Sequence, residues 1–233
     1  MSDRAPISVV IPTLNAGSSL SSALASLAPA ALGGLIREVV VSDGGSNDAT
    51  AQIAEDAGAR TVSGPAGRGG QLARGASHAR GDWLLFLHAD TILTADWEDD
   101  ARALMAEGQG RAGVFTLKFD AAGLAPAIVA AGAMVRTRIF ASPYGDQGLL
   151  VSRSLYEKIG GYRDMALFED VDFIDRLVRH EGRRALVVMR SKAVTSAEKY
   201  RRDGYLRRVL KNARCLALYR LGAAPEKIAG HYA

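Results

Sequence analysis

The 233-residue sequence predicts an α/β fold, with a mostly parallel central sheet flanked by helices. Short apolar runs of strand length recur along the first half of the chain, and stretches with helical spacing of apolar residues separate them. The runs are apolar at nearly every position, as is typical of strands that are buried on both faces of a parallel sheet. Polar or glycine-rich turns follow several of these runs directly, which indicates where the strands end.

The first half of the chain alternates strands and helices. We expect strands over 7–11, 39–41, 60–63, 83–87 and 113–117. We expect helices over 18–28, 49–57 and 96–107, and a further helix that follows residues 64–71 and ends at 79. Pro12 is expected to end the first strand, because proline cannot donate to a sheet ladder.

The second half is less regular. It predicts a helix over 124–140, a strand over 149–151, a short helix near 154–159, a helix that opens at 167–172 and a last strand over 185–189. A final helix has one apolar face, formed by Leu206, Val209, Leu210, Ala213, Leu216 and Ala217. Four basic residues lie largely off that face: Arg207, Arg208, Lys211 and Arg214.

Charge is unevenly distributed along the chain. The net charge is +4, but residues 176–220 hold 14 Lys and Arg against 3 Asp and Glu. This basic segment suits a phosphate-bearing ligand or an anionic membrane surface, and it equally suits a solvated helix face. The single cysteine, Cys215, excludes an internal disulfide and a cysteine-rich metal site. The longest apolar run, 124–135, is too short for a bilayer span of about 20 residues.

Polar side chains follow three of the predicted strands at the point where each strand ends. Thr13, Asp43 and Asp90 occupy these positions. Because the carboxyl ends of parallel strands meet at one edge of a sheet, we expect the three to converge there. A carboxylate at Asp90 suits a hard cation such as Mg²⁺ or Mn²⁺, although it would also suit a helix cap or a turn. Capping is the alternative for Asp43 too, but Asn47 and Asp48 are better placed for it.

Two further features suit an anionic ligand or a metal. Residues 67–71 place glycines beside Arg68 at a helix start, which suits an anion but is neither a P-loop nor a dinucleotide-binding motif. His88 lies two residues before Asp90 and on the same side of the strand. An imidazole there suits a transition metal or a hydrogen bond to ribose or phosphate, and an ordinary strand-end histidine is the alternative.

Four motifs in this order resemble a family 2 glycosyltransferase of the GT-A fold. They are Val9-Val10-Ile11-Pro12-Thr13-Leu14-Asn15, the segment from Glu38 to Asp48 with Thr50, Leu87-His88-Ala89-Asp90-Thr91, and Gly160-Gly161-Tyr162 through Glu169-Asp170. The variant at 88–91, together with 67–71 and 144–148, further resembles the bacterial arsenosugar-biosynthesis glycosyltransferases. Two positions depart from the family pattern: Ala16 stands where glutamate is frequent, and His88 replaces the first acid of a DxD motif.

The resemblance implies a nucleotide-diphosphate sugar donor, a divalent cation (Mn²⁺ or Mg²⁺) and an inverting transfer. It implies that Asp90 holds the metal and that Asp170, beside Glu169, supplies the catalytic base. Donor-binding positions are Pro12, Thr13, Asn15, Asp43, Gly44, Arg68, Gln71, His88 and Asp90. Acceptor-side positions are Tyr144, Gly145, Asp146 and Gln147.

We therefore expect a single catalytic domain over 1–233. Residues 1–118 would form the nucleotide-sugar-binding half, 119–199 the acceptor-side half and 200–233 a basic amphipathic helix. The expected acceptor is a small molecule or a lipid-linked one, with no nucleic acid as partner. The expected location is the cytoplasm, with peripheral contact to the inner membrane face through the basic helix. The alternatives are a nucleotidyltransferase on the same fold and a non-catalytic module that binds nucleotide-sugar or a membrane surface.

Overall fold

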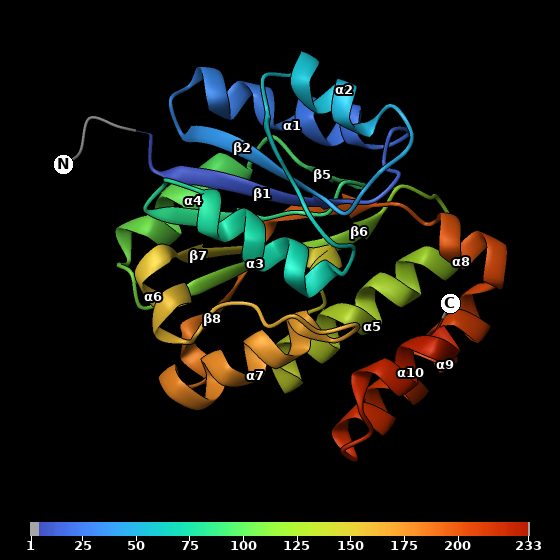
Figure 1. The fold of residues 1–233 in the computed structure, drawn as a ribbon. Coiled ribbons are helices and arrows are strands. Elements are labelled where there is room, and N and C mark those ends of the chain that lie inside the picture. Colours follow the sequence, from blue (N-terminus) through green and yellow to red (C-terminus); the bar gives the residue numbers. More distant parts are fainter. Residues whose placement is uncertain (1–4, 233) are drawn as a thin grey trace.

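The computed structural model describes residues 5–232, which form one eight-stranded sheet with helices on both faces (Figure 1). The strands are β1 (Ile7–Thr13), β2 (Ile36–Asp43), β3 (Arg60–Ser63), β4 (Trp83–Phe86), β5 (Thr91–Leu93), β6 (Ala112–Phe119), β7 (Leu149–Ser152) and β8 (Leu186–Thr195). The α-helices are α1 (Leu20–Leu32), α2 (Thr50–Asp56), α3 (Arg68–His78), α4 (Trp97–Ala106), α5 (Leu124–Phe140), α6 (Arg153–Lys158), α7 (Glu169–Glu181), α8 (Glu198–Asp203), α9 (Tyr205–Arg220) and α10 (Pro225–Tyr232). Two short 3₁₀ turns, η1 (Gly145–Gln147) and η2 (Arg183–Ala185), complete the described elements.

The sheet is mostly parallel, as predicted. Its strand order is β3-β2-β1-β4-β7-β6-β8-β5. Parallel pairing joins β1 to β2 and β4, β2 to β3, and β6 to β8. Only β7, which lies between β4 and β6, and β5 at the edge run in the opposite direction. Six strands therefore end at the same edge of the sheet, and the loops that follow them meet there.

Strand alternation sends successive side chains into two separate hydrophobic clusters. Val9 and Ile11 pack with helices α1, α2 and α4, whereas Val10 packs with α3, α6 and α7. Both faces of the central strands are buried, which explains why their sequences are apolar at nearly every position. The sheet is thus held rigidly between two helical layers (Figure 1).

Three details of the predicted elements were wrong. Pro12 does not end the first strand, because β1 continues to Thr13. Pairing between β1 and β4 stops at Val10, so no hydrogen bond to β4 is lost where proline lacks an N–H. The three-residue strand β5 was not predicted. The last strand is longer than expected, because β8 continues to Thr195 and pairs with β6 over most of its length.

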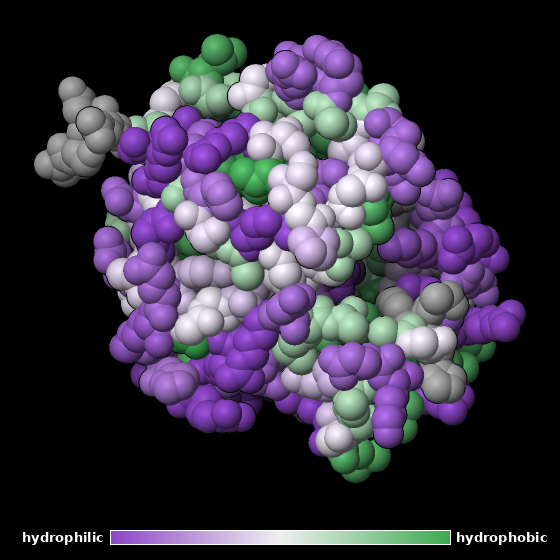
Figure 2. Space-filling view, in the orientation of Figure 1, coloured by the Kyte–Doolittle hydropathy of each residue, from purple (hydrophilic) through white to green (hydrophobic). Residues whose placement is uncertain are grey.

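The C-terminal segment forms three helices rather than one. In Figure 1, α5, α9 and α10 lie side by side at the lower right, beside the sheet. The buried residues of α9 are Arg208 and Cys215, whereas the apolar face of the helix remains largely exposed. Figure 2 shows hydrophobic side chains among hydrophilic ones on this part of the surface. Among residues 5–232, none of the helices combines the length and the apolar character that a membrane crossing needs.

Candidate active site

Two adjoining cavities open at the carboxyl ends of the strands. The first, of about 130 Å³, lies beyond β6 and β8 and is lined by Asp146, Asp170 and side chains from α7, α8 and α9. The second, of about 450 Å³, lies beyond β1 and β4 and is lined by residues of the loop after β1. Four residues line both cavities: Arg68, His88, Asp90 and Lys199. The structure therefore brings the strand-end residues of both halves of the sheet to one place.

Asp43 organises the loop that follows β2. Its Oδ1 accepts hydrogen bonds from the hydroxyls of Thr13 (2.9 Å) and Ser46 (2.5 Å), and its Oδ2 accepts from the backbone N–H groups of Gly45 (2.9 Å) and Ser46 (2.8 Å). Burial acts to raise the pKa of this carboxyl, but the hydrogen bonds outweigh it and hold the pKa below its ordinary value. The side chain is 5% exposed and its acceptors face the loop, so Asp43 shapes the rim of the cavity instead of lining it.

Gln71 joins three segments beneath the same rim. Its Nε2 donates to the backbone carbonyls of Thr13 (2.7 Å) and Ser42 (2.9 Å), and its Oε1 accepts from the N–H of Gly67 (3.2 Å). All of these partners are backbone groups. The amide therefore positions β1, β2 and the start of α3 relative to one another.

The loop after β1 contributes the rest of this rim. Pro12, Thr13 and Asn15 line the larger cavity. Asn15 adopts a left-handed backbone conformation, and its Oδ1 accepts from the N–H of Asn47 (3.0 Å). Gly44 lies against the Gln71 side chain, where an added Cβ would come within 3.1 Å of Nε2. The rim is therefore a closely fitted assembly of the loops after β1 and β2.

His88, Gly145 and Asp170 meet at the centre of the site. The N–H of Gly145 donates to Asp170 Oδ2 at 2.6 Å, and the N–H of Val171 donates to Asp170 Oδ1 at 2.7 Å. A Cβ added at Gly145 would lie 2.6 Å from His88 Nε2. Burial, with help from the nearby cations of Arg68 and Lys199, lowers the pKa of His88 to about 3, so the imidazole is neutral at physiological pH.

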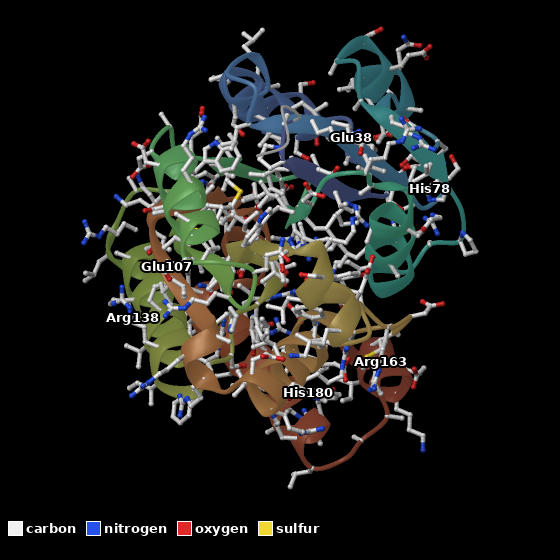
Figure 3. The ribbon with its side chains drawn as sticks, turned by 90° about the vertical axis from the view of Figure 1, so that its left-hand side faces the viewer. Glu38, His78, Glu107, Arg138, Arg163 and His180 are labelled. Atoms are coloured by element: carbon white, nitrogen blue, oxygen red, sulfur yellow. The ribbon has the colours of Figure 1, made fainter. Side chains whose placement is uncertain are left out.

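His88 is distinguished from other histidines by its position. Figure 3 labels His78 and His180, which are exposed on the outside of the fold. Neither lines the two cavities, whereas His88 lines both.

Glu169 holds Arg68 instead of lining the cavities. Its side chain is 1% exposed, and its Oε1 pairs with the Nε of Arg68. Burial raises the pKa of Glu169, the neighbouring Asp170 raises it further, and the Arg68 guanidinium opposes both effects. The sequence placed Glu169 among the catalytic residues, but in the structure it orients the arginine that faces the site.

Of the predicted acceptor-side residues, Tyr144, Gly145 and Asp146 line the first cavity and Gln147 does not. Gln147 is fully buried, and its amide donates to the Phe115 carbonyl (3.0 Å) and accepts from the Thr137 hydroxyl (2.7 Å). Gln147 can therefore shape the acceptor side only indirectly, through the position of η1. Both ends of its amide are used to hold η1 against β6 and α5.

Tyr144 and Asp146 lie beside Arg136 of α5. The Arg136 guanidinium carbon lies 3.4 Å from the centroid of the Tyr144 ring. Burial raises the pKa of Asp146 to about 6, although Arg136 opposes the shift. The Oδ1 of Asp146 is buried and has no hydrogen-bond partner among the described residues.

Asp90 and His88 are the side chains here that suit a divalent cation. Among residues 5–232, no group of three or more His, Cys, Asp or Glu side chains is arranged to hold a metal ion. One carboxylate and one neutral imidazole leave most of a cation's coordination positions to other ligands. The carboxylate suits Mg²⁺, which commonly binds one or two carboxylates together with substrate phosphates and water, whereas the imidazole suits a transition metal such as Mn²⁺.

The sequence did not predict the residues that reach the site from the segment after β8. They are Ser196, which precedes α8, and Lys199, Tyr200, Arg208 and Asn212 of α8 and α9. The signal that points to them is the length of β8, because a strand that ends at Thr195 places the next residues at the same sheet edge as Asp43 and Asp90. Arg208 is 6% exposed and pairs with Asp203 at 3.0 Å, so part of the predicted basic face points into the protein.

The start of α7 is strained next to Asp170. Phe168 has a φ of 66°, in the left-handed region that costs a bulky side chain roughly 1–2 kcal/mol. Its ring stacks on Tyr219 of α9, with centroids 4.8 Å apart. Packing against a C-terminal helix therefore holds the turn that carries Asp170.

The arrangement of strand ends, carboxylates and cations agrees with what comparison of the sequence reveals. Residues 8–122 match the family described as glycosyl transferase family 2. This segment ends just after β6, so β7, α7 and the terminal helices lie outside the matched region.

Curated relatives are similar over a shorter stretch. Glucosyl-3-phosphoglycerate synthases of Mycolicibacterium smegmatis and Mycolicibacterium paratuberculosis are each 37% identical over 95 residues. The stretch covers 37% of this chain and only 31% and 29% of those proteins.

Solved structures extend the likeness across most of the chain. Glucosyl-3-phosphoglycerate synthase from Mycobacterium tuberculosis, in complex with Mn²⁺, UDP and glucosyl-3-phosphoglycerate, matches with a TM-score of 0.62 and 22% identity over 82% of this chain and 72% of that one. Its complex with Mn²⁺, UDP-glucose and phosphoglyceric acid gives 0.60 and 24% over 79% and 69%. Its complex with Mg²⁺ and UDP gives 0.61 and 22% over 82% and 71%. These matches confirm the predicted GT-A fold.

Proposed function

We propose that this protein transfers a sugar from a nucleotide-diphosphate donor to an acceptor hydroxyl, with inversion at the anomeric carbon. The observation that carries the proposal is that Asp90 and Asp170 line one cavity together with the cationic side chains of Arg68 and Lys199. A diphosphate needs positive charge beside it, and an attacking hydroxyl needs a carboxylate to take its proton. The cationic side chains and the carboxylate line the same cavity.

The reaction is a single displacement. The acceptor oxygen forms a bond to the anomeric carbon while the bond from that carbon to the diphosphate oxygen breaks. The acceptor proton passes to Asp170, and the bonding electron pair leaves with the nucleoside diphosphate. The hydrogen bond from Gly145 N–H fixes the orientation of the Asp170 carboxylate and leaves lone pairs for the acceptor hydroxyl.

Asp90 is the residue that we assign to a divalent cation, with His88 beside it. Mn²⁺ or Mg²⁺ supplies charge stabilisation for the departing diphosphate when it is bound. Arg68, held by Glu169, contacts the donor phosphates, and the rim built on Asp43 and Gln71 receives the nucleoside. His88 is neutral, so it contributes hydrogen bonding and not charge.

The similar solved structures hold UDP or UDP-glucose, which supports a uridine donor as the first to test. The narrower resemblance to arsenosugar-biosynthesis glycosyltransferases rests on residues 88–91, 67–71 and 144–148 and remains a prediction about the acceptor.

The test is a donor screen with the full-length protein. UDP-, GDP- and dTDP-sugars are incubated with Mn²⁺ or Mg²⁺ and mixed acceptors, and release of nucleoside diphosphate is measured. We expect acceptor-dependent diphosphate release that stops with EDTA and returns with added metal. Pyrophosphate release from a nucleoside triphosphate would instead identify a nucleotidyltransferase, and donor binding without turnover would identify a binding module.

Product stereochemistry tests the displacement separately. UDP-glucose is α-linked, so inversion gives a β-glycoside, which proton NMR distinguishes by its anomeric coupling. An α-linked product would refute both the single displacement and the role of Asp170 as its base.

A further inference from the structure

A deep groove runs between α5 and α9 and has no role in the steps described so far. Its volume is about 550 Å³, within the range of roughly 300–1,000 Å³ that small-molecule pockets occupy. Its walls are mostly apolar: Leu117, Ala125, Ile128, Val129, Gly132, Ala133, Leu206, Val209, Ala213 and Leu216. The two helices that form the walls lie side by side in Figure 1.

The groove opens into the candidate active site. Tyr144, Asp146, Tyr200 and Asn212 line both the groove and the first cavity at the strand ends. These shared residues are polar or amphipathic, whereas most of the other residues that line the groove are aliphatic. A molecule lying in the groove would therefore reach the reaction centre with one end.

The described residues leave the aliphatic walls of the groove partly uncovered. Leu206 is 73% exposed and Ile128 is 60% exposed. An amphipathic helix normally buries its apolar face against a core, so the apolar face of α9 is unusual. Contiguous exposed apolar surface of this kind marks a binding site.

Polar atoms without partners lie where the groove meets the active site. Arg136 Nη2 and Asp146 Oδ1 are both buried, and neither has a hydrogen-bond partner among the described residues. Buried polar atoms are normally paired, because an unpaired one costs roughly 1–3 kcal/mol. The oxygen of a hydroxyl could accept from the Arg136 guanidinium, which leaves its proton free to pass to Asp170.

We propose that this groove binds the acceptor and that the acceptor is an alcohol with a long aliphatic chain. The chain lies between α5 and α9, and the hydroxyl end reaches Asp146, Arg136 and the active site. The inference rests on the proposed glycosyl transfer and specifies its acceptor class. It differs from the phosphoglyceric acid held by similar solved structures, which has no aliphatic chain to fill such a groove.

The experiment compares butanol, octanol and dodecanol as acceptors for the sugar from UDP-glucose, or from whichever donor the screen identifies. Each methylene buried in the groove is expected to raise kcat/KM about fourfold until the groove is filled. Gly132→Leu places a side chain in open space on the groove wall, where an added Cβ meets no atom within 4 Å. We expect this variant to reduce the rate with dodecanol to the level seen with butanol.

Ala131→Leu is the matched control, because it adds the same side chain to the neighbouring residue of α5, outside the groove. It is expected to use dodecanol as the unchanged protein does. Ala213→Leu narrows the groove from α9 and should act as Gly132→Leu does. If Gly132→Leu has a lowered melting temperature, Ala213→Leu still tests whether the chain lies in the groove.

The outcomes separate this inference from the proposed function. Equal use of butanol and dodecanol, or a chain-length effect that survives both groove variants, would overturn the acceptor class while leaving glycosyl transfer intact. A lack of nucleoside diphosphate release with every donor and every acceptor would instead count against the proposed function.

Discussion

The rim after β1 and β2 and the groove between α5 and α9 differ in the hydrogen bonding of their buried polar atoms. At the rim, Asp43 accepts four hydrogen bonds and the Gln71 amide uses both of its ends. At the inner end of the groove, Asp146 Oδ1 and Arg136 Nη2 have no partner within the described residues. The Asp43 and Gln71 side chains are fully paired, although the neighbouring Ser42 hydroxyl has no partner, whereas the inner end of the groove leaves a carboxylate oxygen and a guanidinium nitrogen for a ligand to satisfy.

The difference suggests a division of tasks between the two regions. A preorganised rim favours binding of the nucleotide donor, because few groups of the protein have to be ordered when the donor binds. The groove carries an unpaired carboxylate oxygen and an uncovered apolar wall, both of which lower the stability of the protein until a ligand binds. Substitutions in the two regions should therefore have opposite effects on stability.

The largest effect is expected where the two regions meet, at Asp170. Asp170→Asn keeps the size of the side chain but cannot take up a proton from the acceptor, so the transfer rate should fall roughly 10²–10⁴-fold. Donor binding, measured by thermal stabilisation, should persist. Asp99→Asn, exposed on α4, is the control. Unaltered turnover in Asp170→Asn would remove this residue from the base role.

Gly145→Ala should come next. The added Cβ would lie 2.6 Å from His88 Nε2, so the imidazole and the turn whose N–H holds Asp170 would have to move apart. A misplacement of about 1 Å costs roughly 10²-fold in rate. Gly110→Ala, where an added Cβ meets nothing within 4 Å, should leave the rate unchanged. The measurement is the steady-state rate of each variant. Comparable rates for Gly145→Ala and Gly110→Ala would contradict the close packing of Gly145 against His88.

Asp43→Asn tests the completed rim. The amide has one acceptor oxygen where the carboxylate has two, so N–H groups at Gly45 and Ser46 lose a partner. We expect a loss of about 2–3 kcal/mol in the free energy of unfolding, measured with urea. Asp56→Asn, on the exposed side of α2, should change it little.

The effect of Asp43 also depends on pH. Its folded pKa lies below the ordinary 3.8, so its contribution is fully present above that pH. The contribution is lost as the pH falls through the lowered folded value. The wild-type and Asp43→Asn stabilities should therefore converge in acid, and a constant difference down to that range would refute this account.

Asp146→Asn should show the opposite sign. The pKa of Asp146 is raised from 3.8 to about 6, so ionisation destabilises the fold and stability falls as the pH rises between these values. Well above pH 6 the variant should be more stable than the original protein by up to roughly 3 kcal/mol, and below pH 3.8 the difference should vanish. Its rate with an alcohol acceptor should nevertheless fall. A variant less stable at neutral pH would contradict the contrast between the two regions.

The rim could be predicted from the sequence because its causes are local. The apolar run Val39-Val40-Val41 specifies a buried strand, and parallel strands must end at one edge, so Asp43, Asp90 and Thr13 were expected together. The direction of β7 could not be predicted, because the apolar run Leu149–Val151 is the same for either direction. The three residues of β5 carry too little pattern to identify a strand.

The groove could not be predicted for a different reason. An apolar stripe on α9 indicates a face, but no local pattern says whether the protein or a ligand covers it. The sequence likewise gives no means of telling Gln147, which is buried and used internally, from Tyr144, which lines the cavity. These distinctions depend on how distant segments pack.

The contact between Phe168 and Tyr219 connects α9 to the turn that carries Asp170, the proposed base. A protein shortened before α9 would keep the whole sheet and the loops after β1 and β2, yet it would lose the ring that holds Phe168 in its left-handed conformation. The first turn of α7 would then relax, and amide hydrogens near Asp170 would exchange faster with solvent. Helix α9 thus supports the first turn of α7, and a partner that displaced α9 would disturb the position of the Asp170 carboxylate.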